Sequence, residues 1–448
     1  MNQTEIRAAL SLAAVYVLRM LGLFMVMPVL AILAVEYADY SAVMLGLAIG
    51  GYGLTQALLQ IPMGILSDKI GRKPVIIGGL LVFALGSAVA AMSDSMLWLV
   101  IGRFMQGAGA IAGAIMALAG DVSRENQRSK VMAIIGVAIG FSFYLALLLG
   151  PLIANHLGLS GIFSITGILA VLCIPLIIWL VPSASNYAPK GDTLPVLVDV
   201  KTLFFNPHLR QLNVSVLLLH MMITLFFVQV PNLLISYGWQ LDSHWKLYLP
   251  VLTGSVLSMI FLMFAAKKTS QIVIIKFSIG LLAAVFTGMY LHKDSLLILL
   301  LLSWLFFTAF NFLEANFPAM VSSIAPAGKK GSAMGIYASF QFFGAFLGGL
   351  LSGLASQYLG PTWVFMLAAI ICLLWLVMAQ GLNGIQSLKR YTLAVNLQAQ
   401  SVEQVGQVLA GINGVLDITI VPDEGTVYLK VDDDHFNLQE TKKALNIE

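Results

Sequence analysis

Charged residues are scarce in this chain: Asp, Glu, Lys and Arg make up 10% of its 448 residues, whereas 59% are hydrophobic. A soluble domain carries about 25% charged residues, because charge covers the surface that faces water. Too few charges are therefore present for a soluble or a disordered chain of this length. The composition instead predicts a membrane-embedded protein, in which each spanning helix takes about 20 apolar residues.

Cysteine is scarce as well. The two cysteines, Cys173 and Cys372, both lie inside apolar runs, so we expect neither a disulfide framework nor a metal site. The chain lacks the glycine-rich phosphate loop of nucleotide hydrolases, since Ser323 replaces the first glycine before Ala327-Gly-Lys-Lys-Gly331. No nucleophile–base pair is evident either. We therefore expect no cofactor and no enzymatic activity, and a net charge of +3 argues against nucleic-acid binding.

The apolar residues gather in twelve runs, each long enough to form a membrane-spanning helix. These runs cover residues 8–34, 41–66, 74–92, 96–119, 130–155, 160–181, 210–236, 247–266, 272–291, 295–321, 332–357 and 361–383. Lysine and arginine gather in alternate loops, so the positive-inside rule predicts that both termini are cytoplasmic. An even number of spans agrees with that prediction.

A polar stretch with four prolines separates six runs from six, which suggests two related halves. We expect an N-terminal six-helix bundle over residues 1–181, a cytoplasmic linker over 182–209 and a C-terminal six-helix bundle over 210–385. The fold class is thus an all-α membrane protein, with a small α+β domain at 390–448.

The small domain is predicted from a change of pattern. A strand at 391–397 precedes a helix at 402–412, which opens with a capping box of Ser401 and Gln404. Strands at 416–420 and 427–431 and a helix at 437–445 follow. This order resembles a ferredoxin-like domain with a missing or very short fourth strand. Its first loop lacks the C-x-x-C of metal-binding relatives. Nine acidic residues against three lysines make the domain negative, so we expect it to dock on basic cytoplasmic loops.

A glycine-rich and charged motif lies between the second and third runs: Gly64-Ile-Leu-Ser-Asp-Lys-Ile-Gly-Arg-Lys-Pro74. It resembles motif A of the major facilitator superfamily, in the loop where that family keeps it. Gly64 lets two helix ends approach, and Gly71 allows a tight turn. The expected charge cluster consists of Asp68, Arg72 and Lys73. A purely topological role would explain the basic residues, but not the glycines and the aspartate at these positions.

The resemblance implies that this motif is a conformational latch. Asp121, at the end of the fourth run, matches the acid that pairs with the motif A arginine, here Arg72. Asp68 would meet the positive N-terminal end of the eleventh helix, near residues 331–332. These contacts would hold the two halves together on the cytoplasmic side in the outward-facing state.

Two further motifs support the same resemblance. Leu99-x-x-x-Arg103-x-x-Gln106-Gly107 resembles motif B, whose arginine either organises backbone carbonyls or takes part in proton transfer. Gly150-Pro151 resembles the core of motif C of antiporters, although Ala146 replaces its first glycine. The chain thus resembles the drug:proton antiporter type of the family. That resemblance implies two bundles around a cavity that opens alternately to each side of the inner membrane.

Four ionisable residues lie inside the predicted spans, away from their ends: Arg19, Arg103, His220 and Glu314. Such residues cost about 2.5–3.5 kcal/mol on insertion scales and usually mark function. They fall in the first, fourth, seventh and tenth spans, which line the central cavity in the family that the chain resembles. Their distribution therefore fits that fold.

Glu314 is the strongest candidate for proton coupling or cation sensing, because a medium of low dielectric disfavours its ionised form. The alternative is a structural carboxyl group that holds the tenth helix to its neighbour. Three roles are open for Arg19: a counter-ion to a facing acid, a binding group for an anionic substrate, or a hydrogen-bonded clamp between helices. His220 either takes up and releases protons near physiological pH or is a packing residue between helices. Candidates for polar contacts in the cavity are Asn311, Gln56, Gln60, Gln229 and Gln341.

The leading functional hypothesis is a monomeric, proton-coupled exporter of small amphipathic or drug-like compounds. Without a nucleotide-binding loop, transport must run on an ion gradient or on the gradient of the substrate. The incomplete motif C leaves open an uptake or facilitative carrier for a small polar metabolite. A membrane sensor that keeps the carrier fold without transport is the third hypothesis.

Overall fold

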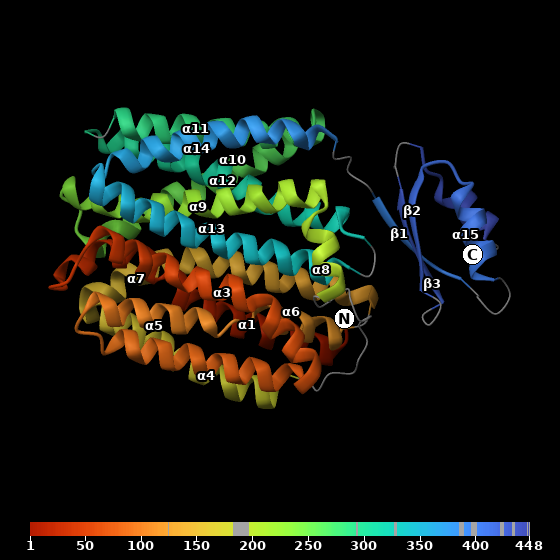
Figure 1. Cartoon of the computed structure of the whole chain (residues 1–448), viewed down its shortest axis with the longest axis horizontal. Coiled ribbons are helices and arrows are strands. Elements are labelled where there is room, and N and C mark those ends of the chain that lie inside the picture. Colours follow the sequence, from red (N-terminus) through yellow and green to blue (C-terminus); the bar gives the residue numbers. More distant parts are fainter. Residues whose placement is uncertain are drawn as a thin grey trace.

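The computed structural model describes the chain except residues 124, 182–196, 293, 327–328, 385–388, 396–400, 422–424, 432–434, 446 and 448. Its described part contains eleven helical stretches that are long and apolar enough to cross a membrane. Figure 1 shows them as an elongated bundle, with the N-terminus and the small C-terminal domain at the same end. Most of the predicted linker, residues 182–196, lies outside the described residues.

The first half of the membrane domain contains seven α-helices and two short helical turns. They are α1 (Gln3–Phe24), α2 (Val26–Leu33), η1 (Ala34–Glu36), α3 (Ala42–Ile70), α4 (Arg72–Ala91), α5 (Met96–Ala108), α6 (Ala112–Asp121), α7 (Glu125–Pro175) and η2 (Leu176–Leu180). The predicted first and fourth spans are each divided, as α1 with α2 and as α5 with α6. The fifth and sixth predicted runs are covered together by α7, and the other runs agree with the helices within a few residues.

The second half begins after a short helix in the linker region. Its elements are α8 (Leu197–Phe204), α9 (Pro207–Ser236), η3 (Leu241–Ser243), α10 (His244–Lys268), α11 (Gln271–Leu291), α12 (Leu296–Ile324), α13 (Lys330–Tyr358), α14 (Trp363–Met378) and η4 (Ala379–Gly384). Because Pro207 starts α9, the second bundle begins three residues before the predicted boundary at 210. Proline suits this position, where its missing N–H is not needed.

The helix α7 covers both the fifth and the sixth predicted span. A straight helix of its 51 residues would measure roughly 75 Å, more than twice the hydrocarbon thickness of a bilayer. At Gly158 the backbone takes φ 63° and ψ −166°, so two helices meet at this residue. Glycine reaches such a positive φ without strain. The break favours twelve crossings, and the twelve-helix count stays a prediction.

The two halves contact each other where α3 packs along α13. Gly46 and Gly349 bring the two backbones together, and a Cβ atom at Gly50 would lie 2.8 Å from the carbonyl oxygen of Phe346. Side chains are thus excluded from this contact by the backbone of the opposite helix. The contact uses the beginning of α3 and the end of α13, so it joins the halves at one end of the bundle.

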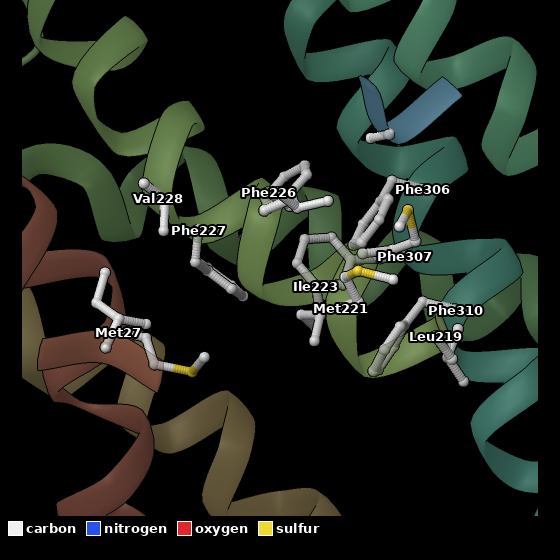
Figure 2. Close-up of a cluster of buried hydrophobic side chains, with 14 of the residues drawn as sticks. Met27, Leu219, Met221, Ile223, Phe226, Phe227, Val228, Phe306, Phe307 and Phe310 are labelled. Atoms are coloured by element: carbon white, nitrogen blue, oxygen red, sulfur yellow. The ribbon is translucent and has the colours of Figure 1, made fainter. Parts of the chain in front are cut away.

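An aromatic cluster forms the core of the second half. Figure 2 shows Phe226 of α9 beside Phe306 and Phe307 of α12, with Met27 of α2 on the other side of α9. The rings of Phe226 and Phe306 are stacked, with centroids 4.4 Å apart. Buried aromatic rings contribute large apolar areas and specific geometry. This packing fixes the position of α12 against α9. It thereby also fixes the position of the turns of α12 that follow Phe307.

The C-terminal domain has the predicted order of strands and helices. It contains β1 (Lys389–Ala394), α15 (Val402–Ala410), β2 (Val415–Val421), β3 (Thr426–Val431) and α16 (Leu438–Ala444). The described strands form an antiparallel sheet in the order β1-β3-β2. Val405 and Leu409 of α15 are buried with Val427 of β3 in a small core. The predicted capping box of Ser401 and Gln404 is present at the start of α15.

Candidate transport cavity

A cavity of about 1370 Å³ lies between the two halves. It is larger than the roughly 300–1,000 Å³ of ordinary small-molecule sites. The cavity extends from Lys330 at the start of α13 to Ile49 of α3 and Ala345 of α13, next to the glycine contact. Helices of both halves line it, mainly with apolar side chains. A drug-sized molecule therefore fits between the halves, with polar contacts from a few residues only.

Glu314, His220 and Gln341 form a polar cluster on the wall of the second half. The Nε2 atom of Gln341 donates hydrogen bonds to His220 Nε2 at 2.7 Å and to Glu314 Oε1 at 3.2 Å. The second carboxyl oxygen, Glu314 Oε2, is 3.8 Å from His220 Nε2 and has no hydrogen-bond partner among the described residues. Three helices, α12, α9 and α13, thus bring the two titratable side chains to one amide.

The hydrogen bonds of this cluster define the state of the histidine. His220 Nδ1 lies 3.2 Å from the carbonyl oxygen of Val216, so it carries the proton that is donated to that oxygen. Its Nε2 then accepts from Gln341, which makes His220 neutral here. Protonation at Nε2 would replace that acceptor with a donor. Protonation of His220 at Nε2 would therefore break its hydrogen bond with Gln341.

Asn311 joins the two halves, as expected for a residue of the cavity wall. Its Nδ2 atom donates to the hydroxyl group of Tyr144 in α7 at 3.0 Å and to Ser255 Oγ in α10 at 3.1 Å. Asn311, Glu314 and Pro318 all line the cavity, as their spacing on one helix face predicts. Tyr144 was not among the candidates from the sequence, although a buried tyrosine hydroxyl needs a polar partner.

Arg19 is buried in the first half, where it contacts α3. Its Nη2 atom donates to the hydroxyl group of Tyr52 and to Gln56 Oε1, each at 2.7 Å. Gln56 Nε2 in turn donates to Gln60 Oε1 at 2.7 Å. Tyr52 and Gln60 line the cavity, whereas Gln56 lies behind them. The predicted polar residues Gln56 and Gln60 thus form one chain with Arg19.

The motif B residues connect α5 to its neighbours. Arg103 Nε donates to the carbonyl oxygen of Ala48 at 2.9 Å, and its Nη1 donates to Gln106 Oε1 at 2.8 Å. Gln106 donates onward to Ser87 in α4. Gly107 leaves room for the backbone of α3, because a Cβ atom there would overlap the carbonyl oxygen of Tyr52. These contacts agree with an arginine that organises backbone carbonyls.

The motif A residues form a charge cluster at the end of α3. Arg72 is paired with Asp68 and with Asp121, each at 2.8 Å, so the expected pairing with Asp121 is present. Gly71 makes the turn with a φ of 98°. Lys73 corrects the prediction: its ammonium group donates to the carbonyl oxygens of Ile178 and Val181 instead of joining the acids. Carbonyl groups left free where a helix ends attract such a cation.

Two other predicted positions have packing roles. Gly150 of the motif C remnant packs on the junction of α1 and α2, since a Cβ atom there would lie 2.7 Å from the carbonyl oxygen of Met25. Pro151 follows it inside α7. Gln229 donates to Ser352 and Ser356 of α13, and it is not among the described residues that line the cavity. A cavity contact for Gln229 stays a prediction.

Aromatic rings at mid-cavity were also missed from the sequence. Phe143 of α7 lines the cavity and meets Phe24 of the same half edge-on, with ring centroids 5.0 Å apart. It also contacts Phe227 and Phe307 of the second half, at 6.1 and 6.4 Å. Phenylalanine is common throughout the apolar runs, so its number alone did not single out this position. In the described part of the chain, no group of three or more His, Cys, Asp or Glu side chains could hold a metal ion.

Comparison with known proteins identifies the family. The chain matches the Major Facilitator Superfamily over residues 12–313 and 274–383. It is 38% identical to the inner membrane transport protein YajR of Escherichia coli K12, over 99% of this chain and 98% of that protein. A tetracycline resistance protein of class H from Pasteurella multocida is 32% identical over 32% of this chain and 35% of its own length.

A solved structure of a bacterial homologue of the human lysosomal transporter Spinster, in an inward-facing and occupied conformation, has the same fold. Its TM-score is 0.71 at 13% identity, over 86% of this chain and 98% of that protein. The relatives and structural neighbours are transporters and not enzymes. Their match covers both halves of the membrane domain. The chain therefore belongs to the major facilitator superfamily.

Proposed function

We propose that this protein is a proton-coupled secondary transporter that exports small amphipathic compounds across the inner membrane by alternating access. The observation that carries the proposal is the cluster of Glu314, His220 and Gln341 on the cavity wall. A carboxyl group with one unpartnered oxygen and a neutral imidazole can each accept a proton. Both are bound to α13, the helix that holds the halves together at the glycine contact.

Twelve spans with cytoplasmic termini complete the proposal. If α7 crosses the membrane twice about its break at Gly158, both ends of the chain lie on one side. The basic loops assign that side to the cytoplasm. The cavity then reaches toward the cytoplasm, and the contact of Gly46 with Gly349 closes the outer side. On this proposal, the described conformation is inward-facing.

Coupling follows when proton and substrate bias the same equilibrium between two conformations. A proton on Glu314 removes the charge from a carboxyl group in a largely apolar cavity, which favours closure of the halves around it. One elementary charge that crosses 100 mV contributes about 2.3 kcal/mol. A proton gradient adds to this term, so concentrative export needs no nucleotide hydrolysis.

The test uses proteoliposomes with a trapped pH-sensitive dye. Neutral, cationic and anionic amphiphiles are added in turn, and proton movement is recorded for the wild type, Glu314→Gln and the control Glu36→Gln. Glu36 is exposed in η1 and is not among the residues that line the cavity. We expect Glu314→Gln to lose substrate-driven proton movement and still to bind the substrate. Equal coupling in Glu314→Gln and the wild type would contradict the proposal, and the sign of the flux separates export from uptake.

We also propose that the C-terminal domain, as a ferredoxin-like module, docks at the cytoplasmic mouth of the cavity and modulates opening. Tyr428 and Leu429 of β3 are among the residues that line the cavity, together with Lys330 and Gly331 of α13. From Tyr391 onward the chain carries a net charge of −6, against +9 for the rest. Opposite charge draws the domain to the basic loops.

A further inference from the structure

Two guanidinium groups are buried against the same tyrosine in the first half. Arg19 is 1% exposed and Arg103 is fully buried. Both meet the same tyrosine: Arg19 donates to the Tyr52 hydroxyl group, and the Arg103 guanidinium carbon lies 5.3 Å from the centre of the Tyr52 ring. The two positive charges are therefore concentrated at one site on α3.

These charges are not neutralised by the described part of the protein. No carboxylate of a described residue lies within 4.0 Å of either group, since the ion pairs found there involve Arg72 and His220. Three of their N–H positions are buried without a partner: Arg19 Nε, Arg19 Nη1 and Arg103 Nη2. Unpaired buried charge is costly, and donors left without acceptors add to that cost. A negatively charged hydrogen-bond acceptor would lower both the cost of the unpaired charges and the cost of the unpartnered donors.

The site adjoins the cavity. Arg103 and Tyr52 are among the lining residues. Arg19 lies directly behind them, since it donates to Tyr52 and its neighbours on α1, Tyr16 and Met20, line the cavity. The remaining wall is mainly apolar and includes Phe143. Glu314 is held on the other half by Gln341 and is not paired with either arginine. One wall of the cavity thus has two guanidinium groups in it or directly behind it, and the same cavity is lined by aromatic rings.

We propose that Arg19 and Arg103 bind the anionic head group of an amphipathic organic anion, a carboxylate or a sulfonate, whose apolar part lies along the aromatic wall. This inference rests on the proposed transport function and names its class of substrate. Guanidinium groups suit such head groups because their N–H donors match two acceptor oxygens. When a monovalent anion leaves the cell in exchange for one entering proton, both movements carry positive charge inward. A membrane potential that is negative inside therefore drives both the anion and the proton.

The test is binding to purified, full-length protein without any gradient. Four probes share a naphthalene body and differ in the head group: 2-naphthoate and 2-naphthalenesulfonate are anions, 2-naphthamide is neutral and 2-naphthylmethylammonium is a cation. The shift of the melting temperature is recorded against probe concentration. We expect the two anions to stabilise the wild type at lower concentrations than the other probes. A stronger effect of the cation, or no effect of either anion, overturns the inference.

Variants locate the binding site. We expect Arg19→Gln to weaken the affinity for both anions by about tenfold or more, the effect of losing a charged hydrogen-bond donor, and to leave the amide probe unaffected. Arg19→Lys keeps the charge and should recover part of the anion affinity. Arg210→Gln, at an exposed position of α9, should bind like the wild type. Unchanged anion affinity in a folded Arg19→Gln protein contradicts the inference.

The two proposals fail in distinguishable ways. Anion binding through Arg19 without proton movement would remove proton coupling and leave the binding site in place. Proton movement driven only by neutral or cationic compounds would retain the transporter and remove the anion site. The wild-type comparison of the four probes needs no substitution, so a missing preference for the anions overturns the inference even if Arg19→Gln does not fold.

Discussion

Gly46 of α3 and Gly349 of α13 meet backbone to backbone, so that a Cβ atom on either residue would overlap the carbonyl oxygen of the other. The halves of the transporter are thus in contact at main-chain distance at one end of the cavity. Main-chain contacts of this kind tolerate no side chain, because neither backbone can move without its helix. The closed end is therefore sensitive to the smallest possible substitution.

Gly46→Ala should hold α3 and α13 apart at this end. We expect slower transport and faster modification of a cysteine placed at Ile49, on the cavity side of the contact, by a membrane-impermeant maleimide. The background carries Cys173→Ala and Cys372→Ala. Gly78→Ala is the matched control, because a Cβ atom there meets nothing within 4 Å. Unchanged labelling of Gly46→Ala would show that the contact does not close the cavity.

Asp68→Asn should slow transport with little effect on substrate binding or stability. Asp68 is 44% exposed and Arg72 keeps Asp121 as a second partner, so the lost pair contributes about 0–1 kcal/mol. Transport rates and equilibrium binding are measured on the same preparation. A loss of binding equal to the loss of rate would count against a latch.

Asp121→Asn should destabilise the protein more than Asp68→Asn does. The Asp121 side chain is 9% exposed, against 44% for Asp68, so its ion pair with Arg72 is better shielded from water and its loss costs more. Melting temperatures of the two variants and the wild type at neutral pH test the order. A larger loss of stability in Asp68→Asn would mean that the ion pair of Arg72 with Asp68 contributes more than its pair with Asp121.

Asp39 should make stability depend on pH in the acid range. Its carboxylate accepts from the backbone N–H of Met96 at 2.8 Å and of Leu97 at 3.4 Å, at the start of α5. The Met96 hydrogen bond, with Leu97 adding to it, lowers the pKa of Asp39 below its ordinary value. The stabilisation is present above that ordinary pKa and is lost as the pH falls through the lowered one.

Melting curves between neutral pH and roughly pH 3, below the ordinary aspartate range, check this dependence. Asp39→Asn should melt at a lower temperature than the wild type at neutral pH, and the difference should shrink in acid. Asp94→Asn, at a nearby exposed residue, serves as the control. A difference that is independent of pH would exclude a role for the carboxylate charge.

Truncation to residues 1–389 should change the transport rate if the C-terminal domain modulates opening. The point variant Tyr428→Ala should reproduce part of the effect, because Tyr428 lines the cavity. Val408→Ala is the matched control: it lies on α15, which Figure 1 shows on the side of the domain away from the membrane bundle. Equal rates for the truncated and full-length proteins would remove the proposed modulation.

The helices and the buried ionisable residues could be predicted from the sequence because the bilayer imposes both. Each run had to reach the length of a span, and each charge inside a run had to face the protein interior. Arg19 and Arg103 are accordingly buried, and Glu314 and His220 line the cavity. Strand and helix order in the C-terminal domain followed from alternation and from the cap at Ser401.

Contacts between distant helices could not be predicted, since they depend on the rotation of each helix about its axis. The hydrogen bonds of Gln229 to α13 and of Lys73 to the end of η2 had no signal in the sequence. Tyr52, which contacts both buried arginines, sits among many apolar residues of α3. In the sequence, only the hydroxyl group of Tyr52 indicated that it contacts polar residues.

Phe143 belongs to one half of the protein but touches rings from both. When the halves tilt, this ring must turn or lose its contacts with Phe227 and Phe307. A fluorine atom on Phe143 would therefore report each conformation by its own NMR shift. This position therefore suits a spectroscopic probe of the transport cycle that needs no label on the substrate.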